Sequence, residues 1–124
     1  MESQEARHGA DNGLRAAAIS NEAVRVMREY TGRGPTKART TIGRELVTIL
    51  MADILTKGEH KLVESGKGER VLQIRHDFQM AMRDELIAAV ETSVGRPVVA
   101  FMSSNHIDPD MAIEAFVLEP EAAA

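Results

Sequence analysis

Apolar residues recur with a helical period through residues 68–95, and they fall on two separate faces of the helix that this pattern predicts. The broad face comprises Val71, Ile74, Phe78, Ala81, Met82, Leu86 and Ala89. A narrower row lies far round the cylinder and comprises Met80, Ile87 and Val94. One face can bury against a sheet, so the second face predicts a further partner.

Helical signals also appear before this segment. Residues 14–30 carry a thin, alanine-rich apolar stripe, and Gly32 is suited to the left-handed position that closes a helix. Thr56 and Glu59 match a capping box, which predicts a short helix over residues 56–65.

Strand patterns occur on both sides of the two later helices. Alternation and β-branched residues predict strands over residues 38–42 and 46–52, and again over 98–102 and 111–118. The nearly continuous apolar run in 46–52 predicts cover on both faces of that strand. The sequence therefore predicts an α+β fold, in which two β-hairpins form a four-stranded, mainly antiparallel sheet packed on an N-terminal helix, a short helix and one long helix.

Length and composition favour one compact domain. The chain has 124 residues, which is enough to bury a core without covalent staples. We expect a flexible tail over residues 1–12, a single α+β domain over 13–120 and a second tail over 121–124. Residues 1–11 lack any apolar periodicity.

Charge and residue usage exclude several classes of function. The net charge is −4 and aromatic residues make up 3% of the chain, so no nucleic-acid partner is expected. The chain has no cysteine, which favours a reducing, cytoplasmic location. No apolar run approaches the length of a membrane span, and no export signal or cofactor motif is found.

A glycine-rich basic loop over residues 31–40 is the first candidate binding site. Its candidate ligand-binding residues are Arg33, Gly34, Lys37 and Arg39. Glycine-rich backbone with nearby cations can bind phosphate. A phosphate-binding loop runs from a strand into a helix, however, whereas this loop follows a helix and precedes a strand. A plain helix stop is the favoured interpretation.

The segment Asn105-His106-Ile107-Asp108-Pro109-Asp110 is the second candidate. An imidazole close to two carboxylates could bind a divalent metal or share a proton. Asp and Pro residues are also what a turn requires, and only His106 is a good zinc ligand. We therefore favour a turn, assign no catalytic residue and no metal, and keep Asn105 and His106 as candidate ligand-binding residues.

Several blocks of the chain resemble one protein family. The segments EYTGRGPTKART, RDEL, RPVVAFMSSNHIDPD and FVLEP together look like the small bacterial MpsC-like, or YbcI-like, proteins, over residues 17–120. The resemblance implies association with a Na+-translocating, membrane-potential-generating system that is linked to inorganic carbon uptake and has separately encoded membrane subunits. It carries over no catalytic residues. The first-hairpin turn Gly43-Arg44-Glu45 departs from the acidic turn of other members.

These observations lead to one favoured function and two alternatives. We expect a non-enzymatic accessory or regulatory subunit that acts as a homodimer through Met80, Ile87 and Val94 and contacts membrane-embedded transport subunits. The first alternative is a sensor of small anions or nucleotides, which binds through the loop at 32–39. The second is a metal-dependent enzyme at His106, Asp108 and Asp110.

Overall fold

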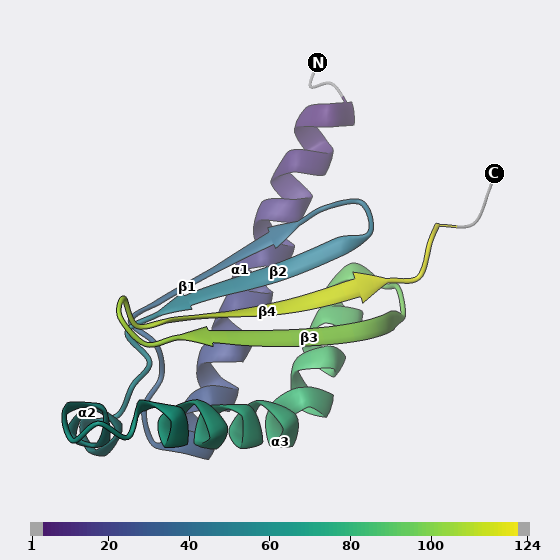
Figure 1. The fold of residues 1–124 in the computed structure, drawn as a ribbon. Helices are drawn as coiled ribbons and strands as arrows, with labels where there is room; N and C mark the ends of the chain where they lie inside the picture. Colours follow the sequence, from purple (N-terminus) through teal and green to yellow (C-terminus); the bar gives the residue numbers. More distant parts are fainter. Residues whose placement is uncertain (1–3, 122–124) are drawn as a thin grey trace.

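The computed structural model describes residues 4–121, with side chains described from residue 11 onward. The elements follow in the order α1 (Gln4–Thr31), β1 (Lys37–Ile42), β2 (Leu46–Ala52), α2 (Lys57–Glu64), α3 (Gly68–Val94), β3 (Val98–His106) and β4 (Met111–Leu118). Two hairpins flank α2 and α3, and they form one antiparallel sheet (Figure 1). The predicted α+β fold is therefore confirmed.

The two hairpins join through their second strands. The strand order is β1-β2-β4-β3, so β2 and β4 lie in the centre and β1 and β3 form the edges. In Figure 1, α1 and the C-terminal part of α3 pass behind the sheet, and the N-terminal part of α3 lies below it; α1 contacts β1 and α3 contacts β3. One face of the sheet is thus covered by helices.

The core lies between that covered face and the two long helices. Along β2 the inward side chains Val47, Ile49 and Met51 are buried, and they alternate with residues that are more exposed. In β4 the ring of Phe116 is completely buried and packs at a tilt on Phe101, with ring centroids 5.3 Å apart. This period of two is what buries one side of each strand.

The helix boundaries agree with the sequence except at the start of α1. Gly32 has a φ of 77° and Gly95 a φ of 71°, so both occupy the left-handed position expected after a helix. The helix α1 begins at Gln4, however, so the predicted tail is helical from residue 4 onward. Residues 4–11 show no apolar period, but extending an existing helix costs much less than nucleating one. Residues 1–3 and 122–124 lie outside the described part of the chain.

The broad apolar face of α3 is largely confirmed, with two polar insertions. Val71, Met82 and Leu86 are buried as predicted, and Val90 joins them, whereas Ala81 is exposed. The same face also buries Arg75 and Gln79, whose polar character hid them from a hydrophobic count.

The narrower row of α3 divides in the structure. Ile87 and Val94 are partly buried against the core of their own chain, whereas Met80 is 41% exposed. The row remains a predicted dimer interface, but Met80 is its only largely exposed member.

The uncovered side of the sheet, called here the open sheet face, is mostly apolar. By strand register its positions are Lys37, Arg39 and Thr41 in β1, Leu46, Thr48, Leu50 and Ala52 in β2, Met111, Ile113, Ala115 and Val117 in β4, and Ala100, Met102, Ser104 and His106 in β3. Within residues 4–121 no helix has the length and apolar content that a membrane crossing requires.

Arg96 holds the turn between β1 and β2 in place. One guanidinium nitrogen of Arg96 donates to the carbonyl of Arg44 and another to the carbonyl of Glu119, each at 2.6 Å. The Gly43-Arg44-Glu45 turn is thereby tied to the ends of α3 and β4.

Candidate functional site

The two loops that stood out in the sequence are joined at one end of the sheet, called here the loop end. Arg33 forms an ion pair with Asp53, at 2.9 Å between the guanidinium and Oδ1. The backbone N–H of Asp53 in turn donates to the carbonyl of Asp110 at 3.0 Å. Segments far apart in the sequence therefore meet here, next to α2 (Figure 1).

The carboxylate of Asp110 fixes the chain between β2 and α2. Its Oδ2 accepts hydrogen bonds from the backbone N–H groups of Ile54 and Leu55, at 2.8 and 2.7 Å. These bonds hold the side chain of Asp110 in one orientation, because both donors belong to the backbone. Asp110 therefore has a structural role, in agreement with the interpretation of its segment as a turn.

Asp53, His60 and Asp110 form a triad of possible metal ligands at the loop end. One ligand atom from each residue lies within 4.8 Å of the other two. Two carboxylates and one imidazole suit Mn²⁺ or Zn²⁺, with water completing the coordination. The carboxylate of Asp53 already has a cation beside it, because Arg33 forms its ion pair there.

Behind the triad lies a buried ion pair. The guanidinium of Arg75 is 3.2 Å from Oε1 of Glu59, and both side chains are almost fully buried. The same oxygen of Glu59 accepts the backbone N–H of Thr56, which completes the predicted capping box. Burial lowers the pKa of Arg75, and the nearby carboxylates of Glu59, Asp110 and Glu114 oppose this change.

A second buried group links α3 to the sheet. Nε2 of Gln79 donates to Oε1 of Glu114 and to Oδ1 of Asn105, each at 2.9 Å, and Nδ2 of Asn105 donates back to Gln79 at 2.8 Å. Burial raises the pKa of Glu114 to about 7, against the opposing effects of Ser103, Gln79 and Arg75. The hydroxyl of Ser103 lies outside hydrogen-bond geometry, so the Gln79 bond is the defined contact.

This buried polar network is incompletely satisfied. Four of its buried atoms have no hydrogen-bond partner: Oε2 of Glu59, Oε2 of Glu114, Nε of Arg75 and Oγ of Ser103. Arg75 faces three carboxylates, so the network holds more acidic than basic groups. A proton on Glu114 near neutral pH reduces that excess, because the protonated carboxyl is neutral.

The first candidate loop has a mainly structural geometry. A Cβ added to Gly34 would lie 3.1 Å from Cγ1 of Val24, so the absence of a side chain lets the loop approach α1. Arg33 is paired with Asp53, whereas Lys37 and Arg39 are exposed on the open sheet face. The loop therefore does not gather its three cations around the backbone of Gly34.

Asn105 and His106 lie on opposite faces of β3. Asn105 points inward to Gln79, whereas His106 is exposed and its Nδ1 lies 2.8 Å from the carbonyl of Pro109. Among the residues with described side chains, Asp110 groups with Asp53 and His60 as possible metal ligands, and not with His106 and Asp108.

Sequence reasoning missed most of the polar network. Arg75 and Gln79 follow Val71 by four and eight positions, which is the spacing of the buried face of α3, so helix geometry could have identified them. Glu114 occupies an inward position of the apolar strand β4, so the alternation of that strand could have identified it as buried. Asp53 and His60 gave no comparable signal, because folding alone brings them to Asp110.

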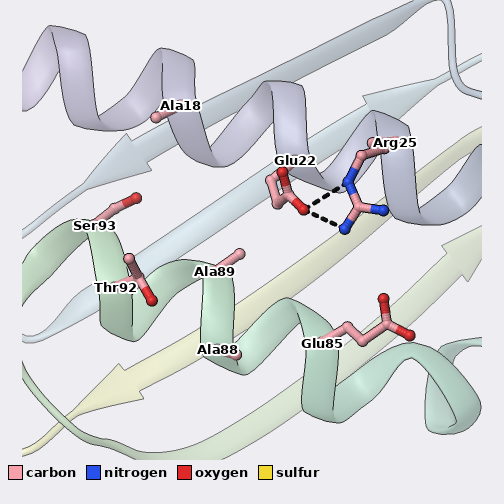
Figure 2. A pocket seen from close by; sticks show the side chains of 8 residues that line it. All are labelled: Ala18, Glu22, Arg25, Glu85, Ala88, Ala89, Thr92 and Ser93. Carbon is pink, nitrogen blue, oxygen red and sulfur yellow. Dashed lines mark hydrogen bonds and ion pairs between the residues drawn. The ribbon is translucent and has the colours of Figure 1, made fainter.

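A shallow groove lies between α1 and α3. Figure 2 shows its wall of small side chains together with charged groups from both helices. Arg25 pairs with Glu22 and Glu29 along α1, and the hydroxyl of Tyr30 donates to Glu85 of α3 at 2.5 Å. Of these contacts, only the Tyr30–Glu85 hydrogen bond joins the two helices, and none of the groove's described lining residues is a buried polar group.

Comparison with known families gives one match. A family model described as "Na+-translocating membrane potential-generating system (MpsC)" matches residues 12–120. No curated protein and no solved structure matches at a significant level. The match covers all the strands, α2, α3 and most of α1, so it includes both the loop end and the open sheet face.

Proposed function

The chain belongs to the MpsC family, and on this basis we propose that it is a non-enzymatic accessory or regulatory subunit of a Na+-translocating, membrane-potential-generating system. It acts in the cytoplasm as a homodimer and contacts membrane-embedded transport subunits. The family resemblance also implies a link between this system and inorganic carbon uptake.

The apolar open sheet face is the observation that supports a binding role. A large exposed apolar patch on a folded protein is typical of a surface that binds another molecule. At the loop end, by contrast, Arg33 is paired with Asp53 and Arg75 with Glu59, and these pairs hold segments together. These two ion pairs serve the fold, so the apolar centre of the open sheet face is the surface available for contact.

Affinity purification of the tagged protein from native membranes tests this role. A subunit of a transport system should recover integral membrane proteins in mild detergent, and the tag alone should not. Recovery of the intact protein without any membrane protein, at native expression level and after chemical cross-linking, would contradict the proposal.

The alternative function is a sensor of small anions or nucleotides that binds through residues 32–39. The other two candidate residues, Asn105 and His106, lie on β3 at the opposite edge of the sheet. Among the described residues Lys37 and Arg39 form no ion pair, which favours this alternative. A ligand of the native state must raise the thermal midpoint. Phosphate, nucleotides and bicarbonate should do so for the parent chain and for Arg83→Ala on α3, but less for Arg39→Ala.

The triad at the loop end gives a second binding candidate, a divalent cation. Mn²⁺ or Zn²⁺ should raise the thermal midpoint, and His60→Ala should reduce that rise because it removes one ligand. His76→Ala is the matched control, since His76 is also an exposed helical histidine. Equal midpoints with and without either metal would leave the triad as a purely structural cluster.

A further inference from the structure

The open sheet face is arranged as four cross-strand rows. From the loop end outward, these are Lys37-Ala52-Met111-His106, then Arg39-Leu50-Ile113-Ser104, then Thr41-Thr48-Ala115-Met102, and finally Leu46-Val117-Ala100. The two central strands place no charged side chain on this face. The charged side chains of this face, Lys37 and Arg39, lie on the edge strand β1, and none of the face residues is acidic.

This composition differs from that of a sheet face that meets only water. An antiparallel sheet with one solvated face normally alternates apolar residues inside with polar residues outside. Here Leu50 is 41% exposed, Ile113 39% and Met102 54%, although all three point away from the core. An apolar centre with a polar rim is instead the usual composition of a protein interface.

We propose that the open sheet face is the contact surface between two copies of this chain, which pack face to face as a two-layered sandwich of sheets. The inference rests on the homodimer of the proposed function and assigns its interface. It places the main contact on β2 and β4 rather than on the Met80, Ile87 and Val94 row of α3.

The sizes of the side chains support a second copy as the occupant. In the two central strands the second row has large residues, Leu50 and Ile113, and the third row has smaller ones, Thr48 and Ala115. A two-fold axis that crosses the strands between these rows places each large pair over the small pair of the other copy. A two-fold contact requires a surface that complements itself in this way.

The same axis keeps Lys37 of one copy away from Lys37 of the other. It places β1 over β1 of the other copy, but with the ends of the sheet exchanged. Lys37, in the first row, then lies over the opposite end of the partner strand rather than over the same residue.

The available area is sufficient for a small dimer. Four strands about 4.8 Å apart and four rows about 6.8 Å apart give a flat footprint of roughly 500 Å² per copy. Two such faces bury about 1,000 Å² before the relief of the side chains is counted, which is near the lower limit for specific interfaces.

A charge placed in the centre of the face tests the interface. The parent chain should be a dimer by light scattering at micromolar concentration, and Leu50→Glu should be a folded monomer, because a carboxylate would be buried in an apolar contact. Leu72→Glu on α3 should remain dimeric. Leu72 is a matched control because it is 37% exposed, compared with 41% for Leu50.

Met80→Glu separates the two candidate interfaces. A dimeric Leu50→Glu together with a monomeric Met80→Glu would overturn the sheet-face assignment and leave the proposed homodimer standing. A parent chain that is monomeric at these concentrations would overturn both the homodimer and this interface. Circular dichroism of each variant shows whether a monomer is still folded.

Cysteine cross-linking gives a second test that does not rely on disruption. The chain has no cysteine, so one introduced thiol reports on one position. Thr48→Cys should give a covalent dimer with a short bis-maleimide, since facing sheets lie about 10 Å apart. Thr92→Cys in the groove of Figure 2 should not. Cross-linking at residue 92 but not at residue 48 would overturn the proposal.

Discussion

The two faces of the sheet have similar apolar content but different surroundings. In β4, Phe116 is fully buried under the helices, while its neighbour Val117 points to the uncovered side. The covered face also contains the buried polar network around Glu114, whereas the central strands of the open face contain no charge. The alternation of residues along the strands therefore defines two faces with similar apolar content. The helices of the chain cover one face, and the other stays exposed in a single copy.

Substitution of neighbouring residues in β4 gives the largest expected contrast. Phe116→Ala should lower the free energy of unfolding by about 3–5 kcal/mol, because it opens a cavity in the core. Val117→Ala should cost less than about 1 kcal/mol, because its side chain has no layer above it. Urea denaturation measures both, in the Leu50→Glu background so that dimer dissociation does not contribute. Equal losses would show that both faces are covered within one chain.

The titration of Glu114 gives a smaller contrast that depends on pH. Its folded pKa is about 7, above the ordinary value of 4.5, so the native state binds more protons than the unfolded state. Stability from this group is then complete below pH 4.5 and is lost as pH rises through 7. Glu114→Gln should remove this loss, with a gain of up to about 3 kcal/mol at pH 8.

Denaturation of Glu114→Gln and of the parent chain at pH 4.5 and pH 8 checks this expectation. At pH 4.5 the two chains should be nearly equal in stability, because Glu114 is then protonated in the native state. A constant difference across this range would mean that Glu114 does not titrate there. Glu45→Gln, an exposed change on the β1–β2 turn, is the control.

The smallest expected contrast lies in β1, where two adjacent threonines face opposite sides. The hydroxyls of Thr40 and Ser20 are 2.7 Å apart between β1 and α1, whereas Thr41 is exposed on the open face. Thr40→Val should cost about 1 kcal/mol, because it leaves Ser20 without that partner. Thr41→Val should change stability by less than about 0.5 kcal/mol. Thermal denaturation at low protein concentration resolves the pair, and a larger loss for Thr41→Val would reverse the assignment of faces.

Local signals in the sequence predicted most of the fold. The capping box of Thr56 and Glu59, the glycine caps and the four strands were all visible, because each depends on residues close together in the chain. The third strand was predicted too short, since β3 runs to His106 rather than ending at residue 102. The start of α1 was missed because polar helix formers carry no apolar period. The run in β2 predicted cover on both sides, and its open side, Leu46 and Leu50, remains exposed in the single chain.

The candidate sites were less predictable than the fold. Arg33 was identified, but its partner Asp53 becomes a neighbour only through the pairing of β1 with β2. Arg75 and Gln79 were not among the predicted site residues, because their burial depends on partners in α2 and β4. The central pairing of β2 with β4 has no local sequence code, so the open sheet face as a continuous surface required the structure.

The contact made by Arg96 has a consequence for how the two hairpins stay in register. Its guanidinium reaches backbone carbonyls at residues 44 and 119, so a single planar group clamps strand ends that belong to separate halves of the chain. A lysine would keep the charge but lacks the rigid fork of donors that reaches two carbonyls together. The alignment of the halves therefore depends on the shape of this cation rather than on its charge alone.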